Sequence, residues 1–130
     1  MKTAYICLVL TGLMPIMCTA IAKWGFENFD NHNPRQWLSE QTGFRARANA
    51  AQANCFEAFP FFATSVLCAI VAKSDLDQLS LVCMLFVALR LLYVVFYITD
   101  KASLRTGAWI STFAAASLYF LPRFMSSPTS

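Results

Sequence analysis

Residues 79–98 read L-S-L-V-C-M-L-F-V-A-L-R-L-L-Y-V-V-F-Y-I, and this stretch decides the fold. It has the length of roughly 20 residues that an α-helix needs to cross a bilayer, and Arg90 is its one charged residue. Apolar and polar residues do not alternate along it as they do in the strands of a membrane barrel. Because lipid cannot hydrogen-bond to free backbone groups, such a stretch crosses the membrane as a helix. We therefore predict a membrane-spanning helix over residues 78–98.

The rest of the chain has the same apolar character. Of its 130 residues, 58% are hydrophobic and 13% are charged, and the mean hydropathy is +0.52. A soluble domain usually carries about 25% charged residues. We predict an all-α membrane protein, a four-transmembrane-helix bundle that forms one domain over residues 1–125 and ends in a disordered tail at 126–130. The expected helices cover residues 3–22, 44–72, 78–98 and 104–122.

The first apolar stretch allows two interpretations. Lys2 and the small residues Ala20 and Ala22 resemble the charged start and the cleavage site of a signal peptide. The stretch is about 20 residues long, however, whereas the apolar part of a signal peptide has about 7–15. The length favours a retained membrane helix, and Pro15 would kink it.

The distribution of Lys and Arg predicts the orientation in the membrane. Three basic residues lie toward the termini, and six lie in or beside the first and third loops. Because positively charged loops stay on the cytoplasmic side, we expect these two loops in the cytoplasm and both termini outside. The residues counted are Lys2, Lys73 and Arg123 on one side, and Lys23, Arg35, Arg45, Arg47, Lys101 and Arg105 on the other.

Two kinds of site are not expected. A net charge of +3 without a block of basic residues gives no basis for nucleic-acid binding. His32, in the polar loop at 23–44, has no Cys or His at ligand spacing, so we expect a solvated histidine and no metal site. The five cysteines include no C-x-x-C pair, and an odd number in apolar helices is typical of reduced packing residues.

Ionisable residues inside the expected helices are the main functional signal. Arg47, Asn54 and Glu57 share one face of their helix, because a spacing of seven and ten residues returns to the same side. Arg90 lies in the next helix, and a charge at membrane depth costs about 2.5–3.5 kcal/mol on insertion scales. Glu57 and Arg90 are therefore candidates for a mutual ion pair. Two interpretations stay open: a structural pair that fixes helix register, or a polar pocket for a small anionic ligand at the cytoplasmic end.

Two runs of residues resemble a known family of membrane proteins. The first is Q-A-N-C-F-E-A-F-P-F-F at 52–62, and the second is R-x-x-Y-x-x-x-Y at 90–97, followed by Arg105. Together they are similar to the MAPEG family, the membrane-associated proteins of eicosanoid and glutathione metabolism. Within that family the pattern resembles the leukotriene-C synthase and microsomal glutathione transferase branches. The resemblance covers roughly residues 44–110.

The resemblance implies a homotrimer that binds glutathione, its co-substrate, between adjacent subunits near the cytoplasmic face. It implies a transferase or peroxidase for lipophilic small molecules that enter from the bilayer. Arg105 matches the arginine that stabilises the thiolate, since a nearby guanidinium favours the anion. The short loops resemble a bacterial branch, which implies the bacterial inner membrane. The residues that match glutathione contacts are Arg47, Gln52, Asn54, Glu57, Arg90, Tyr93 and Tyr97.

One departure from the family pattern concerns position 50. Ala50 stands where the active eukaryotic members carry an arginine, and Arg47 lies one turn earlier on the same face. The alternative to an enzyme is therefore a non-catalytic membrane protein that keeps the fold, with Glu57 and Arg90 as a structural pair. A transporter is disfavoured, because the chain shows no inverted repeat and no pair of broken helices.

Overall fold

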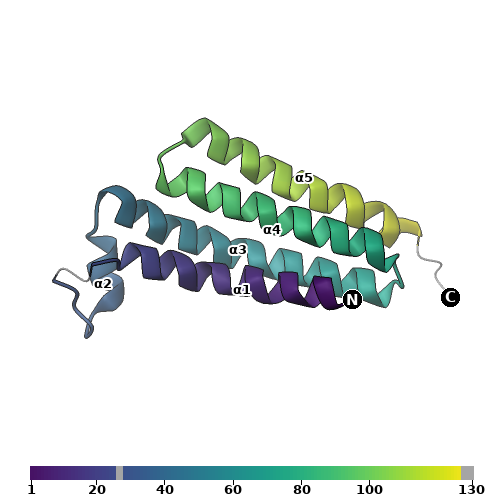
Figure 1. Ribbon diagram of the computed structural model, residues 1–130, viewed down its shortest axis with the longest axis horizontal. Coiled ribbons are helices and arrows are strands. Elements are labelled where there is room, and N and C mark those ends of the chain that lie inside the picture. Colours follow the sequence, from purple (N-terminus) through teal and green to yellow (C-terminus); the bar gives the residue numbers. More distant parts are fainter. Residues whose placement is uncertain (26–27, 127–130) are drawn as a thin grey trace.

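The computed structural model describes residues 1–25 and 28–126, apart from the side chains of 122–124 and 126. These residues are all-α, without a strand, which confirms the all-α part of the predicted fold class. Long helices lie side by side, and a short one lies at one end of them (Figure 1). In chain order the helices are α1 (Lys2–Ala22), α2 (Pro34–Ser39), α3 (Gly43–Val71), α4 (Leu76–Ile98) and α5 (Ala102–Ser126).

The helix α2 is a difference from the expected irregular loop. Pro34 stands at its start, where a fixed φ favours the first helical turn. Trp37 and Leu38 then pack with Ala22 and Ala48 in a small cluster beside the end of α1 and the start of α3. These two buried side chains hold the short helix against its neighbours. Two apolar residues in a polar segment are too few to predict a helix from the sequence.

Tight turns end α3 and α4. Lys73 and Asp100, which follow these helices, have left-handed φ values of 54° and 62°. After α4, the Lys101 N–H donates to the Phe96 carbonyl at 2.8 Å, so the last turn closes on itself. Each turn reverses the chain within a few residues, and α4 therefore runs antiparallel to both α3 and α5. The tail expected at 126–130 lies outside the described residues except for Ser126, which ends α5.

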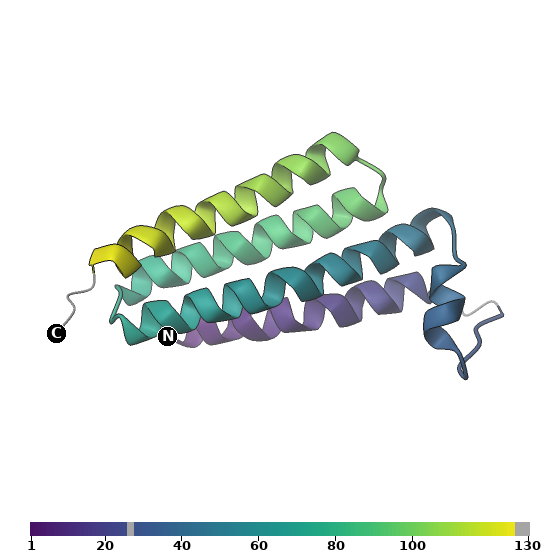
Figure 2. The same ribbon diagram turned by 180° about the vertical axis from the view of Figure 1, so that it is seen from behind.

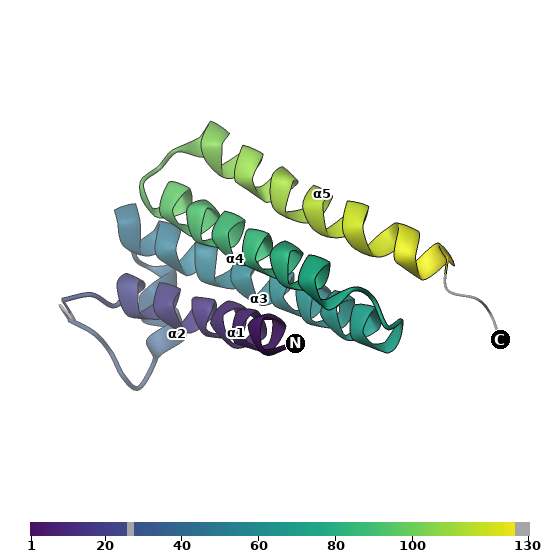
Figure 3. The ribbon, with the colours of Figure 1, turned by 45° about the vertical axis from the view of Figure 1, so that its right-hand side comes forward.

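The core lies where α1, α3 and α4 meet. α1 packs on both α3 and α4, while α5 packs mainly on α4 and makes fewer contacts with α3 (Figures 2 and 3). At the centre, the rings of Phe62 and Phe86 stack with centroids 4.1 Å apart. Both rings are at most 1% exposed. This pair fixes the approach of α3 to α4, the two helices that carry most of the predicted site.

Three helices of the described chain, α1, α3 and α4, are long and apolar enough to cross a membrane. No more than 33% of the most apolar window of each is buried inside the chain, so the remaining apolar surface faces lipid or other protein. These features identify an integral membrane protein. α5 has 25 residues and runs along α4. The N-terminus lies at the same end of the bundle as the end of α5, and α2 lies at the opposite end (Figure 1).

Candidate functional site

Four predicted site residues form a continuous row along α4 and the start of α5. The Arg90 Cζ lies 4.4 Å from the centroid of the Tyr93 ring. The Tyr93 and Tyr97 rings meet edge to face with centroids 5.6 Å apart, and the Arg105 Cζ lies 4.5 Å from the Tyr97 centroid. We call Arg90, Tyr93, Tyr97 and Arg105 the arginine–tyrosine row. A guanidinium over an aromatic face is attracted by the ring's negative potential, so each end of the row is a cation held by a phenol.

The row is buried at one end and accessible at the other. Arg90 is 0% and Tyr93 is 4% exposed, whereas Tyr97 and Arg105 are half-buried. Arg105 lies in the first turn of α5, where the helix dipole disfavours a positive charge. Its stacking on Tyr97 offsets that cost. The row therefore presents one guanidinium and one phenol to a ligand, and it keeps the other pair inside.

Asn54 connects the row to α3. The Arg90 Nη2 donates to the Asn54 Oδ1 at 3.0 Å, and the Asn54 Nδ2 donates to the Glu57 Oε2 at 3.3 Å. The predicted direct ion pair between Glu57 and Arg90 is therefore wrong, since the ion pair found among the described residues joins Arg47 to Asp100. Glu57 is exposed, and a direct pair would bury its carboxylate next to Arg90. The amide of Asn54 relays the contact and leaves the carboxylate accessible.

The guanidinium of Arg90 is only partly satisfied. Besides Asn54, its Nη2 contacts the Cys55 Sγ at 3.5 Å. The Arg90 Nε and Nη1 are buried, and they have no hydrogen-bond partner among the residues that the structure describes. Arg90 contacts Asn54 and Tyr93 inside the chain. Because it is itself buried, it influences the accessible part of the site through the positions of these two residues.

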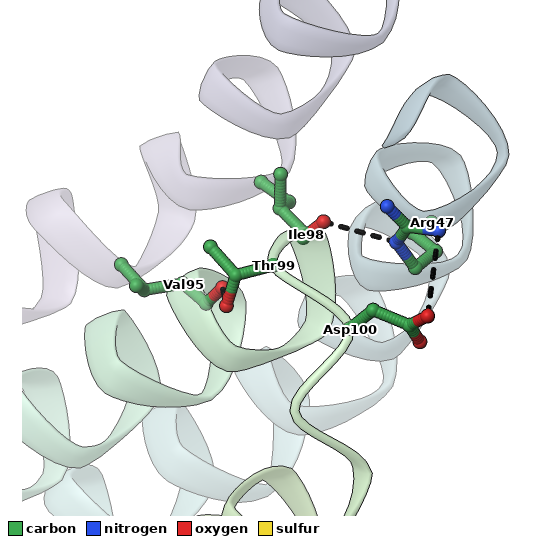
Figure 4. Close-up of polar contacts among 5 residues, drawn as sticks. All are labelled: Arg47, Val95, Ile98, Thr99 and Asp100. Carbon is green, nitrogen blue, oxygen red and sulfur yellow. Dashed lines mark hydrogen bonds and ion pairs between the residues drawn. The ribbon is translucent and has the colours of Figure 1, made fainter. Parts of the chain in front are cut away.

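Arg47 binds the end of α4 (Figure 4). Its Nε donates to the Ile98 carbonyl at 2.9 Å, and its Nη1 lies 3.9 Å from the Asp100 Oδ2. The last carbonyls of a helix lack partners within it, and the negative end of the helix dipole attracts a cation. Arg47 thus ties the start of α3 to the turn that leads to Arg105. Its side chain contacts this turn, and its role as a glutathione contact stays a prediction.

Gln52 lies apart from the row. It lines a cavity of about 610 Å³ between α2 and the outer face of α3. Within one chain, the structure therefore brings Asn54 and Glu57 to the row but does not bring Gln52 there. The residues around this cavity are Arg35, Leu38, Ser39, Gln41, Ala46, Asn49, Ala50, Gln52, Ala53 and Phe56.

An apolar groove of about 600 Å³ between α3 and α5 was not predicted. At its start the Phe61 and Phe113 rings lie 5.2 Å apart, and Phe113 contacts Trp109 at 5.0 Å. Glu57 precedes Phe61 by one turn, and Arg105 precedes Trp109 by one turn. The groove is lined by Pro60, Phe61, Thr64, Ser65, Cys68, Ala69, Ala72, Ser117, Phe120 and Leu121. Sequence reasoning missed it because a groove-lining Phe and a lipid-facing Phe look alike.

The geometry can be compared with known proteins at the level of the family. In the part of the chain that the structure describes, no three His, Cys, Asp or Glu residues are grouped as a metal site would need. No curated protein and no solved structure gives a significant match to the chain. A family model does match, and it covers residues 3–121, nearly the whole length. The matched residues include the whole arginine–tyrosine row on α4 and α5, and also its partner Asn54 on α3. The chain therefore belongs to the MAPEG family.

Proposed function

We propose that the protein is a glutathione-dependent membrane transferase or peroxidase that acts on lipophilic electrophiles. The observation that carries the proposal is the accessible end of the arginine–tyrosine row, where the half-buried Arg105 is stacked on Tyr97. A fixed cation beside a phenol is a suitable environment for a thiolate. Because the chain belongs to a family associated with glutathione, we take glutathione as the thiol.

The available side chains suit the groups of glutathione. Its amino group is a cation, and Glu57 offers an exposed carboxylate that Asn54 orients. Its thiol is matched by Arg105, which stays charged at every physiological pH. Arg90 is enclosed, so we assign to it the positioning of Asn54 and Tyr93.

The proposed chemistry needs little from the protein beyond charge and placement. Bound glutathione would supply the nucleophilic sulfur. A free thiol is only a few per cent thiolate at pH 7, and the Arg105 guanidinium raises that fraction by favouring the anion. The groove between α3 and α5 would accept the lipophilic substrate, because it is mostly apolar and begins at Phe61, one turn after Glu57.

The proposed assembly is a homotrimer with glutathione between subunits. The position of Gln52 supports it, because this residue lines a cavity on a different face of α3 from Asn54. A neighbouring copy could bring that face against the row of the first. We further propose that α5 is the fourth membrane span, in a bacterial inner membrane. The excess of Lys and Arg at the α2 end would place that end in the cytoplasm and both termini outside.

The test is thiolate formation, followed by ultraviolet difference absorbance when glutathione is added to the purified protein. The wild-type protein should give the thiolate signal at millimolar glutathione, and Arg105→Ala should abolish it. Lys101→Ala is the matched control, because Lys101 is an exposed cation one turn earlier in the same segment. Its signal should remain. A wild-type protein without a thiolate signal, or an Arg105→Ala variant that keeps it, contradicts the proposal.

A second candidate is a non-catalytic membrane protein that keeps the fold. It is favoured by the fact that Arg47 and Arg90 are both engaged inside the chain, while position 50 holds Ala50. Fewer cations are then left for the two carboxylates of glutathione. A thermal-shift titration in detergent separates the candidates, since a ligand bound by the native state raises its stability. A shift with Ala50→Arg and none with the wild type would favour the non-catalytic protein.

A further inference from the structure

The cavity between α2 and α3 contains an unengaged positive charge. Its volume of about 610 Å³ is typical of pockets that bind small molecules. Among the described residues that line it, Arg35 is the one with a charged side chain. This side chain is exposed, and within the described chain it takes part in no hydrogen bond and no ion pair. The cavity therefore offers a cation to a ligand from outside the chain.

The two arginines at the start of α3 are engaged inside the chain instead. The Arg45 side chain donates to the Ala22 carbonyl at 3.2 Å, and the Arg47 side chain donates to the Ile98 carbonyl at 2.9 Å. Both carbonyls lie in the last turn of a helix, where they have no partner within that helix. These two arginines thus stabilise helix ends, whereas Arg35 is left for a ligand.

The short helix α2 presents Arg35 to the cavity. α2 lies beside the start of α3 (Figure 1). Arg35, Leu38 and Ser39 all line the cavity, and their spacing of three and four residues puts them on one face of α2. Leu38 also belongs to the buried cluster that includes Trp37 and Ala48. Because this cluster holds α2 against α3, the backbone of Arg35 is in place at the cavity before a ligand binds.

The α3 wall of the cavity adds two amides. Asn49 and Gln52 line the cavity and share one face of α3, because they are three residues apart. Both are half-buried, and their NH₂ groups can donate hydrogen bonds. Ala50 and Ala53 lie on the same wall, and their short side chains leave the space open. Amide donors combined with the guanidinium of Arg35 suit a carboxylate, which can accept two hydrogen bonds from one arginine.

We propose that Arg35 binds a carboxylate of the glutathione held by a neighbouring copy of the chain, with Asn49 and Gln52 as additional donors. This assignment rests on the glutathione function proposed above. There, Glu57 takes the amino group of glutathione and Arg105 takes its thiol. The two carboxylates are the groups that still lack a cation. Arg35 supplies one from a different face of the chain.

Two copies are needed to complete such a site. Asn54 contacts Arg90 on the side of α3 that carries the arginine–tyrosine row, whereas Gln52 lines the cavity on another face. A single chain presents these faces in different directions, so a second copy has to bring its cavity against the row. Because Ala50 lines this cavity without a charge, the contact with the carboxylate depends on Arg35.

The first experiment measures glutathione affinity of the purified full-length protein, by thiolate absorbance and by thermal shift in detergent. Arg35→Gln should weaken binding by at least about tenfold, which is the usual effect of losing a hydrogen bond to a charged group. Arg35→Lys keeps the charge without the paired donors and should recover part of the affinity. Lys101→Gln, at an exposed cation outside the cavity, should bind like the wild type.

The outcomes separate this inference from the proposed function. Circular dichroism checks that Arg35→Gln is folded, as we expect for an exposed side chain without a partner in the described chain. Wild-type affinity in folded Arg35→Gln overturns the role of Arg35 and leaves the glutathione function standing. A wild-type protein that gives neither a thiolate signal nor a thermal shift overturns both.

Two analogues of glutathione test whether a carboxylate is the group that is bound. One analogue has its glycine carboxylate blocked as the ethyl ester, and the other carries γ-aminobutyrate in place of the γ-glutamyl residue. The wild type should bind one of them more weakly than glutathione, and with that analogue Arg35→Gln should cause no further loss. If Arg35→Gln weakens glutathione and both analogues by the same factor, Arg35 binds neither carboxylate and the inference is wrong.

A last experiment tests whether Arg35 acts between copies. Arg35→Gln and Arg105→Ala chains are produced together with different tags, and the mixed assemblies are isolated. Where an Arg35→Gln copy supplies the row and an Arg105→Ala copy supplies the cavity, the site contains both arginines. Mixed assemblies should therefore form the thiolate at glutathione concentrations at which neither variant alone does. No recovery in the mixed assemblies would refute the contact between copies.

Discussion

Replacing Asn54 by leucine should destabilise the protein more than replacing Arg90 itself. Within the described part of the chain, Asn54 gives Arg90 its one oxygen acceptor, at 3.0 Å. Arg90 itself is 0% exposed. Leucine has a similar volume but no acceptor. The charge then stays buried with only the Cys55 sulfur and the Tyr93 ring beside it.

The magnitude follows from the contacts that are lost. A hydrogen bond to a charged group contributes about 1.5–3 kcal/mol, and breaking a buried ionic partnership costs about 3–5 kcal/mol. Because Asn54 is a neutral partner and Arg90 keeps its sulfur and ring contacts, we expect the upper part of the first range for Asn54→Leu, about 2–3 kcal/mol in the free energy of unfolding. Arg90→Met removes the charge together with its two unsatisfied donors. It should therefore cost less than Asn54→Leu, and the double variant should be more stable than Asn54→Leu alone.

The assay is unfolding by a denaturing detergent in mixed micelles, followed by circular dichroism at fixed protein concentration. Gln52→Leu is the matched control, since Gln52 lies two residues away on the α3 face that lines the other cavity. It should change the free energy by no more than about 0.5 kcal/mol. The reasoning is refuted if Asn54→Leu is as stable as the control, or if the effects of Asn54→Leu and Arg90→Met simply add in the double variant.

Two further predictions concern the core and the first loop. Phe62→Ala should lower the free energy of unfolding by about 3–5 kcal/mol, because the ring is fully buried. Phe56→Ala, at an exposed ring of the same helix, should lower it far less. Similar losses for the two variants in the same unfolding assay would argue against this core. The Asn33 side chain and the His32 N–H hold the pKa of Asp30 below its ordinary value of 3.8. The turn they form should persist above that value and open as the pH falls through the lowered pKa. A pH titration of the His32 amide by nuclear magnetic resonance, with Asp30→Asn as control, should give a midpoint below 3.8, and a midpoint at or above it would contradict the prediction.

The arginine–tyrosine row could be predicted because it depends mostly on one helix. Arg90, Tyr93 and Tyr97 are spaced by three and four residues, so any regular helix puts them on one face. Arg105 joins them after a short turn that allows α5 little freedom of placement. Local periodicity and a tight turn thus determine the row before any packing is known.

The contacts between helices could not be predicted in the same way. Whether Glu57 meets Arg90 depends on how deeply each side chain is buried, and the structure interposes Asn54. Arg47 could equally have faced a ligand, but the free carbonyl of Ile98 and the carboxylate of Asp100 lie within its reach. These outcomes depend on the relative height and rotation of α3 and α4, about which the sequence of either helix alone says nothing.

Ala50 acquires a different meaning from its place in the structure. On spacing alone it shares a face with Arg47 and Asn54, and its lack of a guanidinium would weaken the contacts of the row. The structure instead places Ala50 in the cavity with Gln52, while Asn54 turns inward to Arg90. The departure from the family pattern therefore removes a cation from the outer cavity and leaves the contact between Asn54 and Arg90 in place. In the proposed trimer that cavity would face a neighbouring subunit, so Ala50 would weaken the contribution that each copy makes to the next copy's glutathione site.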